Sequence, residues 1–210
     1  MVLLAKEQVE VKLTPQEIVE KTTIADVYRA VKNLDGVIYK TKLIYSDYFS
    51  NLSHNDIYIK PETCKNRFFQ TSRSYNCISQ LSEEQKAHGV IAASAGNHAQ
   101  GVAYAAQQLG VKAVIVMPAT TPLLKVEATR AYGAEVVLSG DSFDDAAAKA
   151  VELQQEFNYT FIHPFNDIEV ILGQGTTALE IIDDLKDVDA ILVPIGGGGF
   201  ASGVALATKW

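Results

Sequence analysis

The sequence predicts an α/β protein in which helices cover both faces of a parallel sheet. From residue 82 onward, short apolar runs of strand length alternate with longer segments that have helical periodicity. Most of these runs are uncharged and rich in Val, Ile and Ala, as is typical of strands buried on both faces. Glycine or proline stands at several of the boundaries. Such alternation requires crossover connections, and therefore a parallel sheet.

The N-terminal quarter of the chain is expected to be mainly helical. Thr14 and Pro15 mark a helix start, because Thr caps a first turn and Pro is tolerated at its first position. After about residue 55, the alternating segment Ile57-Tyr58-Ile59 is expected to form a short strand.

The remaining elements follow in a regular order. Ser82 and Gln85 form a capping-box pattern that opens a short helix. Gly110 and Gly133 close two later helices, and Ser142 caps a third. The predicted strands are residues 90–93, 113–117, 135–138, 159–162 and 190–193. The predicted helices are residues 97–109, 122–132, 144–157, 168–185 and 201–210.

Composition excludes several classes of function. The 210-residue chain is 48% hydrophobic, carries a net charge of −7 and has no dense basic stretch, which argues against nucleic acid or a membrane surface as partner. Cys64 and Cys77 are too few for a disulfide framework, and the four histidines are dispersed, so we expect no bound metal. The N-terminus shows no export signal, and we expect a soluble, cytoplasmic protein.

One stretch, residues 190–208, is uncharged and about long enough to cross a bilayer. Pro194 and the four glycines at 196–199 would interrupt the helix that a bilayer requires. We therefore expect a loop followed by a helix here.

Two glycine-bearing loops follow predicted strands and precede predicted helices. They are Ser94-Ala95-Gly96-Asn97-His98-Ala99-Gln100-Gly101 and Gly196-Gly197-Gly198-Gly199. Parallel sheets bind ligands at the carboxyl ends of their strands, and N–H groups at a helix start hold a carboxylate or phosphate without a cationic side chain. The second loop also fits a loose dinucleotide pattern, Gly196-x-Gly198-x-x-Ala201, so a dinucleotide-binding module is an alternative.

Three motifs, taken in order, resemble the threonine dehydratase (threonine ammonia-lyase) family of pyridoxal-phosphate enzymes, whose fold is the tryptophan synthase β-like fold type II. The motifs are the loop 94–101, then Gly173-Gln174-Gly175-Thr176, then Val193-Pro194-Ile195 with the four glycines. The resemblance implies a two-domain lyase that removes water and then ammonia from L-threonine. The product is 2-oxobutanoate, and the reaction is the first step toward isoleucine, a branched-chain amino acid. Because family members often form tetramers, the resemblance also implies a homo-oligomer.

The resemblance further implies roles for individual residues. Asn97 would contact the ring hydroxyl of pyridoxal phosphate. The backbone N–H groups of Gly196, Gly197, Gly198, Gly199 and Phe200 would hold its phosphate. The substrate carboxylate would lie against Ser94, Ala95, Gly96, Asn97 and His98. Residues 1–55 and 166–210 would belong to the larger domain, and residues 56–165 to the smaller one.

The chain departs from the family at the lysine that binds the cofactor covalently and transfers the substrate proton. The family segment reads Glu-Asn-x-Gln-x-Thr-x-Ser-Phe-Lys-x-Arg-Gly-Ala, and here Gln70 stands at about the lysine position. A carboxamide can perform neither task. The nearest lysines, Lys60 and Lys65, are expected to be solvated surface residues. A shifted reading frame over about residues 63–74 would restore Ala-Ser-Phe-Lys-Leu-Arg-Gly, a hypothesis that the gene's nucleotide sequence tests.

A second departure is length, because the family's catalytic domain continues beyond the position of Trp210. We therefore expect the larger domain to be incomplete. Both departures predict that this chain has no appreciable threonine deamination. The alternatives to a disabled threonine dehydratase are a noncatalytic binder of pyridoxal phosphate or amino acids, and the dinucleotide module.

Overall fold

The computed structural model describes residues 17, 20–62 and 71–209. In chain order, its helices and strands are α2 (Ile24–Leu34), β1 (Ile44–Tyr45), α3 (Asp47–Ser53), β2 (Tyr58–Ile59), α4 (Thr71–Ser79), α5 (Glu83–His88), β3 (Val90–Ala93), α6 (Asn97–Leu109), β4 (Ala113–Met117), α7 (Leu123–Arg130), β5 (Glu135–Leu138), α8 (Phe143–Phe157), β6 (Thr160–Phe161), α9 (Ile168–Asp184) and α10 (Gly199–Thr208).

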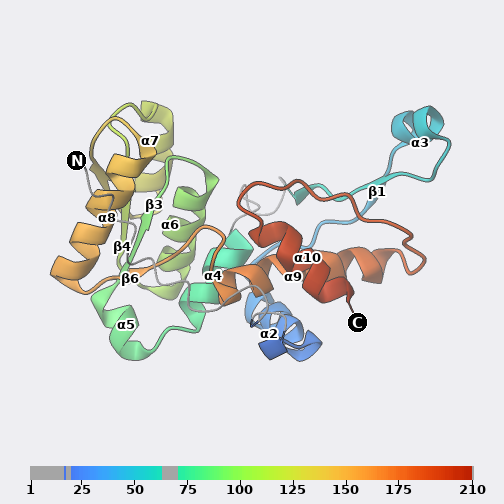
Figure 1. The fold of residues 1–210 in the computed structure, drawn as a ribbon, viewed down its shortest axis with the longest axis horizontal. Helices are drawn as coiled ribbons and strands as arrows, with labels where there is room; N and C mark the ends of the chain where they lie inside the picture. Colours follow the sequence, from blue (N-terminus) through green and yellow to red (C-terminus); the bar gives the residue numbers. More distant parts are fainter. Residues whose placement is uncertain (1–16, 18–19, 63–70, 210) are drawn as a thin grey trace.

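A four-stranded parallel sheet confirms the predicted fold class. The strand order is β5-β4-β3-β6, and every neighbouring pair runs parallel. In Figure 1 the sheet and its helices lie on one side of the molecule, and α2, α9 and α10 lie on the other. Because β3 and β4 are the inner strands, the loops at their carboxyl ends lie side by side at one edge of the sheet.

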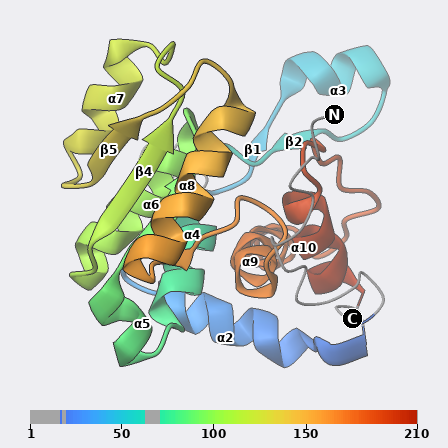
Figure 2. The same ribbon diagram turned by 60° about the vertical axis from the view of Figure 1, so that its left-hand side comes forward.

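Alternate residues of the inner strands point to opposite faces of the sheet, as the pleat requires. Val90 and Ile115 pack in a core with side chains of α4, α6 and α7, whereas Ile91 and Val114 pack in a second core with α8. Figure 2 shows α8 in front of the strands and α6 behind them. The strands are therefore buried on both faces, which explains their continuous apolar runs.

A third core joins α2, α9 and α10 away from the sheet. Helices α9 and α10 pack closely at a pair of glycines. A Cβ built on Gly203 of α10 would lie 2.4 Å from the backbone oxygen of Ile171 and 2.7 Å from the backbone nitrogen of Gly175. Only residues without a side chain let the two helices pack this closely. The division into domains at residues 55 and 165 stays a prediction.

The helix ends predicted at Ser82, Gly110 and Ser142 are confirmed, whereas α7 ends at Arg130, two residues before the end predicted from Gly133. Ser82 and Gln85 exchange both hydrogen bonds of the capping box at α5. Ser142 caps α8 in the same way, with Asp145 as its partner. Gly110 follows α6 with a φ of +66°, a conformation that favours glycine.

The predicted strand at residues 190–193 is wrong, because this segment has no regular structure. Leu192 is 91% exposed and Ile195 is 76% exposed. A strand needs a neighbour for its backbone hydrogen bonds, and none pairs with this segment within the part of the chain that the structure describes. Sequence also missed β1, which pairs antiparallel with the predicted strand β2.

Two further predictions concern the ends of the chain. The predicted helix start at Thr14 lies outside the described residues. The predicted final helix is confirmed as α10, which begins at Gly199. Over residues 17, 20–62 and 71–209, no helix has the length and apolarity that crossing a membrane would take.

Candidate functional site

The loop between β3 and α6 stands at the carboxyl edge of the sheet. The Ser94 N–H donates to the Val116 carbonyl at 3.1 Å, which continues the strand ladder into the loop. The Ser94 hydroxyl then accepts the Gly96 N–H at 3.2 Å. Asn97 is the first residue of α6 and its side chain is exposed. The N–H groups of a first helical turn have no acceptor within the helix, so this loop offers donors to an anion.

His98 has a side chain that fixes the loop instead of facing solvent. The ring is buried, and Nε2 lies 3.0 Å from the Ile162 carbonyl oxygen, to which it must donate. Burial and the positive charge of Arg73 lower the pKa of His98 to about 3, despite the Ile162 hydrogen bond. His98 is therefore neutral, and it ties the β3–α6 loop to the end of β6.

The segment after β6 links this loop to the glycine run. His163 Nδ1 accepts the backbone N–H groups of Phe165 at 3.2 Å and of Asn166 at 2.7 Å. Burial lowers the pKa of His163, which favours the neutral ring that such acceptance requires. The two bonds hold residues 163–166 in a tight turn, with the Phe165 ring edge-on to the imidazole at 4.7 Å between centroids.

The glycine run packs directly on Phe165. A Cβ on Gly197 would lie 2.3 Å from the Phe165 ring, and one on Gly199 would lie 2.8 Å from the Phe165 carbonyl oxygen. Gly198 has a φ of +87° and caps α10, and its carbonyl accepts the first helical hydrogen bond from Ser202 at 2.9 Å. This loop thus requires glycine for two reasons, close packing and a left-handed backbone.

The backbone of the glycine run also borders open space. A Cβ on Gly196 or on Gly198 would meet nothing within 4 Å. A cavity of about 490 Å³ lies here, lined by Phe165, Asn166, Ile171, Gly197, Gly198, Gly199, Ser202, Ala205, Leu206 and Lys209. The bare backbone beside a helix N-terminus suits a phosphate ester, which binds N–H groups that side chains do not obstruct.

The two predicted loops are therefore joined by a chain of contacts. The first loop is bonded to Ile162 through His98, and the turn that follows Ile162 supports the second loop through Phe165. His163 and Phe165 are site residues that sequence reasoning missed. The spacing of residues along the chain carries no signal that this turn lies between the loops.

The prediction for Lys60 is wrong, because its side chain is only 7% exposed. Its Nζ lies 2.6 Å from a carboxylate oxygen of Glu180 on α9, and it also donates to the Thr41 carbonyl. Lys60 directly follows strand β2 of the hairpin, which places its side chain against the Glu180 carboxylate of α9. Lys65 and Gln70 lie outside the described residues.

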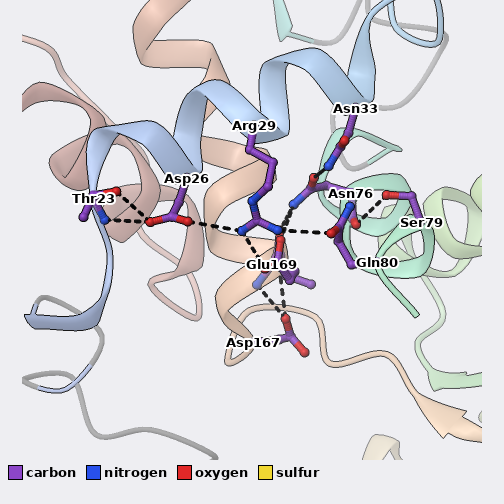
Figure 3. Close-up of polar contacts among 10 residues, drawn as sticks. Thr23, Asp26, Arg29, Asn33, Asn76, Ser79, Gln80, Asp167 and Glu169 are labelled. Atoms are coloured by element: carbon purple, nitrogen blue, oxygen red, sulfur yellow. Dashed lines mark hydrogen bonds and ion pairs between the residues drawn. The ribbon is translucent and has the colours of Figure 1, made fainter. Parts of the chain in front are cut away.

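Helix α4 (Thr71–Ser79) was not predicted. It is anchored by a partly buried polar network, shown in Figure 3. Asn76 Nδ2 donates to the carbonyl of Glu169 at 2.8 Å and to its carboxylate at 2.9 Å. The same carboxylate accepts a hydrogen bond from the guanidinium of Arg29 in α2, with 2.9 Å between Nη2 and Oε1. The network fastens α2 and α4 to the start of α9.

The sequence matches a known protein family over most of its length. The family described as "Pyridoxal-phosphate dependent enzyme" matches residues 34–210. The chain is 50% identical over 190 residues to the biosynthetic L-threonine dehydratase of Haemophilus influenzae, covering 88% of this chain and 37% of that protein. It is 46% identical over 187 residues to the catabolic L-threonine dehydratase of Escherichia coli, covering 89% and 57%.

Solved structures agree with these matches. The processed form of threonine deaminase isoform 2 from Solanum lycopersicum superposes with a TM-score of 0.86 at 41% identity, covering 94% of this chain and 53% of that one. The chain thus spans between 37% and 57% of the length of these three proteins.

Proposed function

Because the chain belongs to the pyridoxal-phosphate dependent enzyme family, matched over residues 34–210, we propose that it binds pyridoxal phosphate at the glycine run before α10. The reaction we propose for its lineage is the dehydration and deamination of L-threonine to 2-oxobutanoate and ammonia. Relatives named biosynthetic and catabolic match at 50% and 46% identity, so the proposal is the reaction that they share.

The observation that carries the proposal is the glycine run itself. Gly197, Gly198 and Gly199 line a cavity, and Phe165, which packs on Gly197 and Gly199, lines the same cavity. In the proposal, N–H groups from Gly196 to Phe200 hold the phosphate, aided by the dipole of α10. An acidic chain with a net charge of −7 can bind a phosphate this way, since the donors are neutral.

The β3–α6 loop supplies the second half of the proposed site. Asn97 is exposed at the start of α6 and carries both a donor and an acceptor, which suits the ring hydroxyl of the cofactor. Residues 94–98 hold the substrate carboxylate through N–H groups at the same helix start. His98 contributes by fixing the loop, because its ring is bonded to Ile162.

When bound, pyridoxal phosphate supplies an electron sink for the negative charge left by the departing α-proton. A protein group must remove that proton, and in the family this group is the lysine. Gln70 at the matched position cannot do so. Lys60 cannot replace it, because its ammonium is buried against Glu180. We therefore propose that this chain binds the cofactor reversibly and does not deaminate threonine.

The test combines binding with chemistry. Purified protein is titrated with pyridoxal phosphate, then treated with borohydride and weighed by mass spectrometry, and 2-oxobutanoate is assayed with L-threonine. The proposal expects saturable binding, no covalent adduct and no 2-oxobutanoate above the protein-free rate. A borohydride-stable adduct on one lysine, or turnover at rates typical of enzymes, would contradict it. Retention on a nicotinamide or flavin nucleotide, with no pyridoxal phosphate bound, would instead favour the dinucleotide alternative.

A further inference from the structure

The motif Gly173-Gln174-Gly175-Thr176 lies in the middle of α9, away from both predicted loops in the sequence. Its glycines are packing residues. A Cβ on Gly173 would lie 2.8 Å from the Cα of Arg73 in α4, and Gly175 contacts Gly203 of α10. The motif therefore lets α9 lie closely between α4 and α10. That leaves the glutamine between the two glycines to be explained.

Gln174 is 2% exposed, and neither its Nε2 nor its Oε1 has a hydrogen-bond partner among the described residues. Buried amides are nearly always bonded, since burial without a partner loses the hydrogen bonds that water would provide. Two unpartnered atoms in one side chain are unusual in a folded protein. Such a group is typical of a site whose partner is a ligand.

The amide of Gln174 lies against the start of α10. A Cβ on Gly199 would be 3.0 Å from Nε2, so the amide approaches the backbone that forms the first helical turn. Nε2 carries two N–H donors, and an anion selects this end of the amide over the oxygen. The position adds a side-chain donor to the row of backbone donors at residues 196–200.

We infer that Gln174 is a binding residue for the phosphate group held at the start of α10, donating from Nε2 to a phosphate oxygen. The inference rests on the proposed function, because the phosphate ester it names is that of the proposed cofactor. It predicts that Gln174 contributes to affinity only when the ligand carries a phosphate. The affinity for pyridoxal, which lacks a phosphate, should not depend on Gln174.

The test compares the dissociation constants of pyridoxal phosphate and pyridoxal for the whole chain and its variants. Gln174→Met removes both donors with little change in volume, and should weaken pyridoxal phosphate binding about tenfold or more, with no change for pyridoxal. Gln174→Glu keeps the shape but places a carboxylate near the phosphate, and should weaken binding further. Gln174→Leu, which also lacks both donors and adds no charge, serves if the methionine variant folds poorly.

Thr176→Val is the matched control on the same helix. Thr176 is 2% exposed, and its hydroxyl donates to the Gly173 carbonyl at 2.8 Å, so its own partner is already in the protein. The variant should bind pyridoxal phosphate like the parent chain. If Gln174→Met lowers the affinities for both ligands equally, or for neither, Gln174 is a packing residue and the inference fails.

Inorganic phosphate separates this inference from the proposed function. If the parent chain does not bind pyridoxal phosphate, the proposed cofactor is wrong, and thermal unfolding in phosphate decides about Gln174. A midpoint raised by phosphate in the parent and Thr176→Val proteins, but not in Gln174→Met, supports the phosphate-binding role. Equal midpoint shifts in the parent chain and Gln174→Met, zero included, overturn it.

Discussion

Acid should destabilise this protein through His98, and the size of the effect follows from the structure. The folded-state pKa of His98 is about 3, whereas the ordinary value is 6.5. Between about pH 3 and pH 6.5, the unfolded chain therefore binds a proton at His98 that the folded chain does not bind. The neutral ring makes its full contribution to the free energy of unfolding above pH 6.5, and this contribution is lost as the pH falls toward the folded-state pKa of about 3.

Each pH unit in this window lowers the free energy of unfolding by about 1.4 kcal/mol. At about pH 4.5 the loss from this one histidine is about 2.7 kcal/mol, a large part of the stability of a typical domain. Other groups also titrate, including Asp26 and Asp145, whose pKa values are lowered by hydrogen bonds from Thr23 and Ser142. A variant is therefore needed to separate the contribution of His98 from that of the other titrating groups.

Urea denaturation at about pH 7 and about pH 4.5 measures the loss in the parent chain and in His98→Gln. Glutamine keeps a donor for Ile162 but does not titrate, so the variant should lose about 2–3 kcal/mol less than the parent chain between the two pH values. His54→Asn removes an exposed histidine at a φ of +55°, which Asn tolerates, and should show the parent's pH dependence. Equal losses in the parent and His98→Gln would refute the buried, neutral ring.

Three further predictions test other parts of the account. Gly203→Ala should lower the free energy of unfolding by about 1–3 kcal/mol in urea titrations, because its Cβ would meet the Ile171 carbonyl at 2.4 Å. Asn76→Leu should cost about 2–3 kcal/mol in the same measurement, since it removes both hydrogen bonds to Glu169. Gln70→Lys alone should produce no 2-oxobutanoate from L-threonine, because the residues around it also differ from the family segment.

Each of these has a control or a contrary result. Gly196→Ala places its Cβ in open space and should leave the free energy of unfolding unchanged, unlike Gly203→Ala. Asn55→Leu removes an exposed, local hydrogen bond to Ser53 and should have little effect beside Asn76→Leu. Turnover of L-threonine by the Gln70→Lys protein would show that the lysine is the only catalytic group the chain lacks.

Local signals in the sequence were enough to predict the four strands of the parallel sheet and helices α5 to α8, but not α4. Capping boxes at Ser82 and Ser142 and the glycine at 110 act on their own turns, so neighbouring residues suffice to locate the helix ends. The uncharged sequences of β3 and β4 indicate strands that are buried on both faces of the sheet. The structure confirms that helices cover both faces. These features depend on chemistry within a few residues.

Features that depend on distant contacts were missed. Residues 190–193 have the apolar composition of a strand, but composition does not supply the neighbour that a strand needs. Lys60 was expected in solvent because the residues near it in the sequence do not indicate its ion pair with Glu180, which lies 120 residues later. The turn at Phe165 and the buried amide of Gln174 became visible only when the two loops were placed in space.

The most direct measurement of the central claim is a crystal structure of this chain grown with pyridoxal phosphate. The account predicts phosphate density against the N–H groups of residues 196–200, within reach of Gln174, and no continuous density from the cofactor to any side chain. Density that joins the cofactor to a lysine, or a phosphate bound elsewhere on the protein, would contradict it.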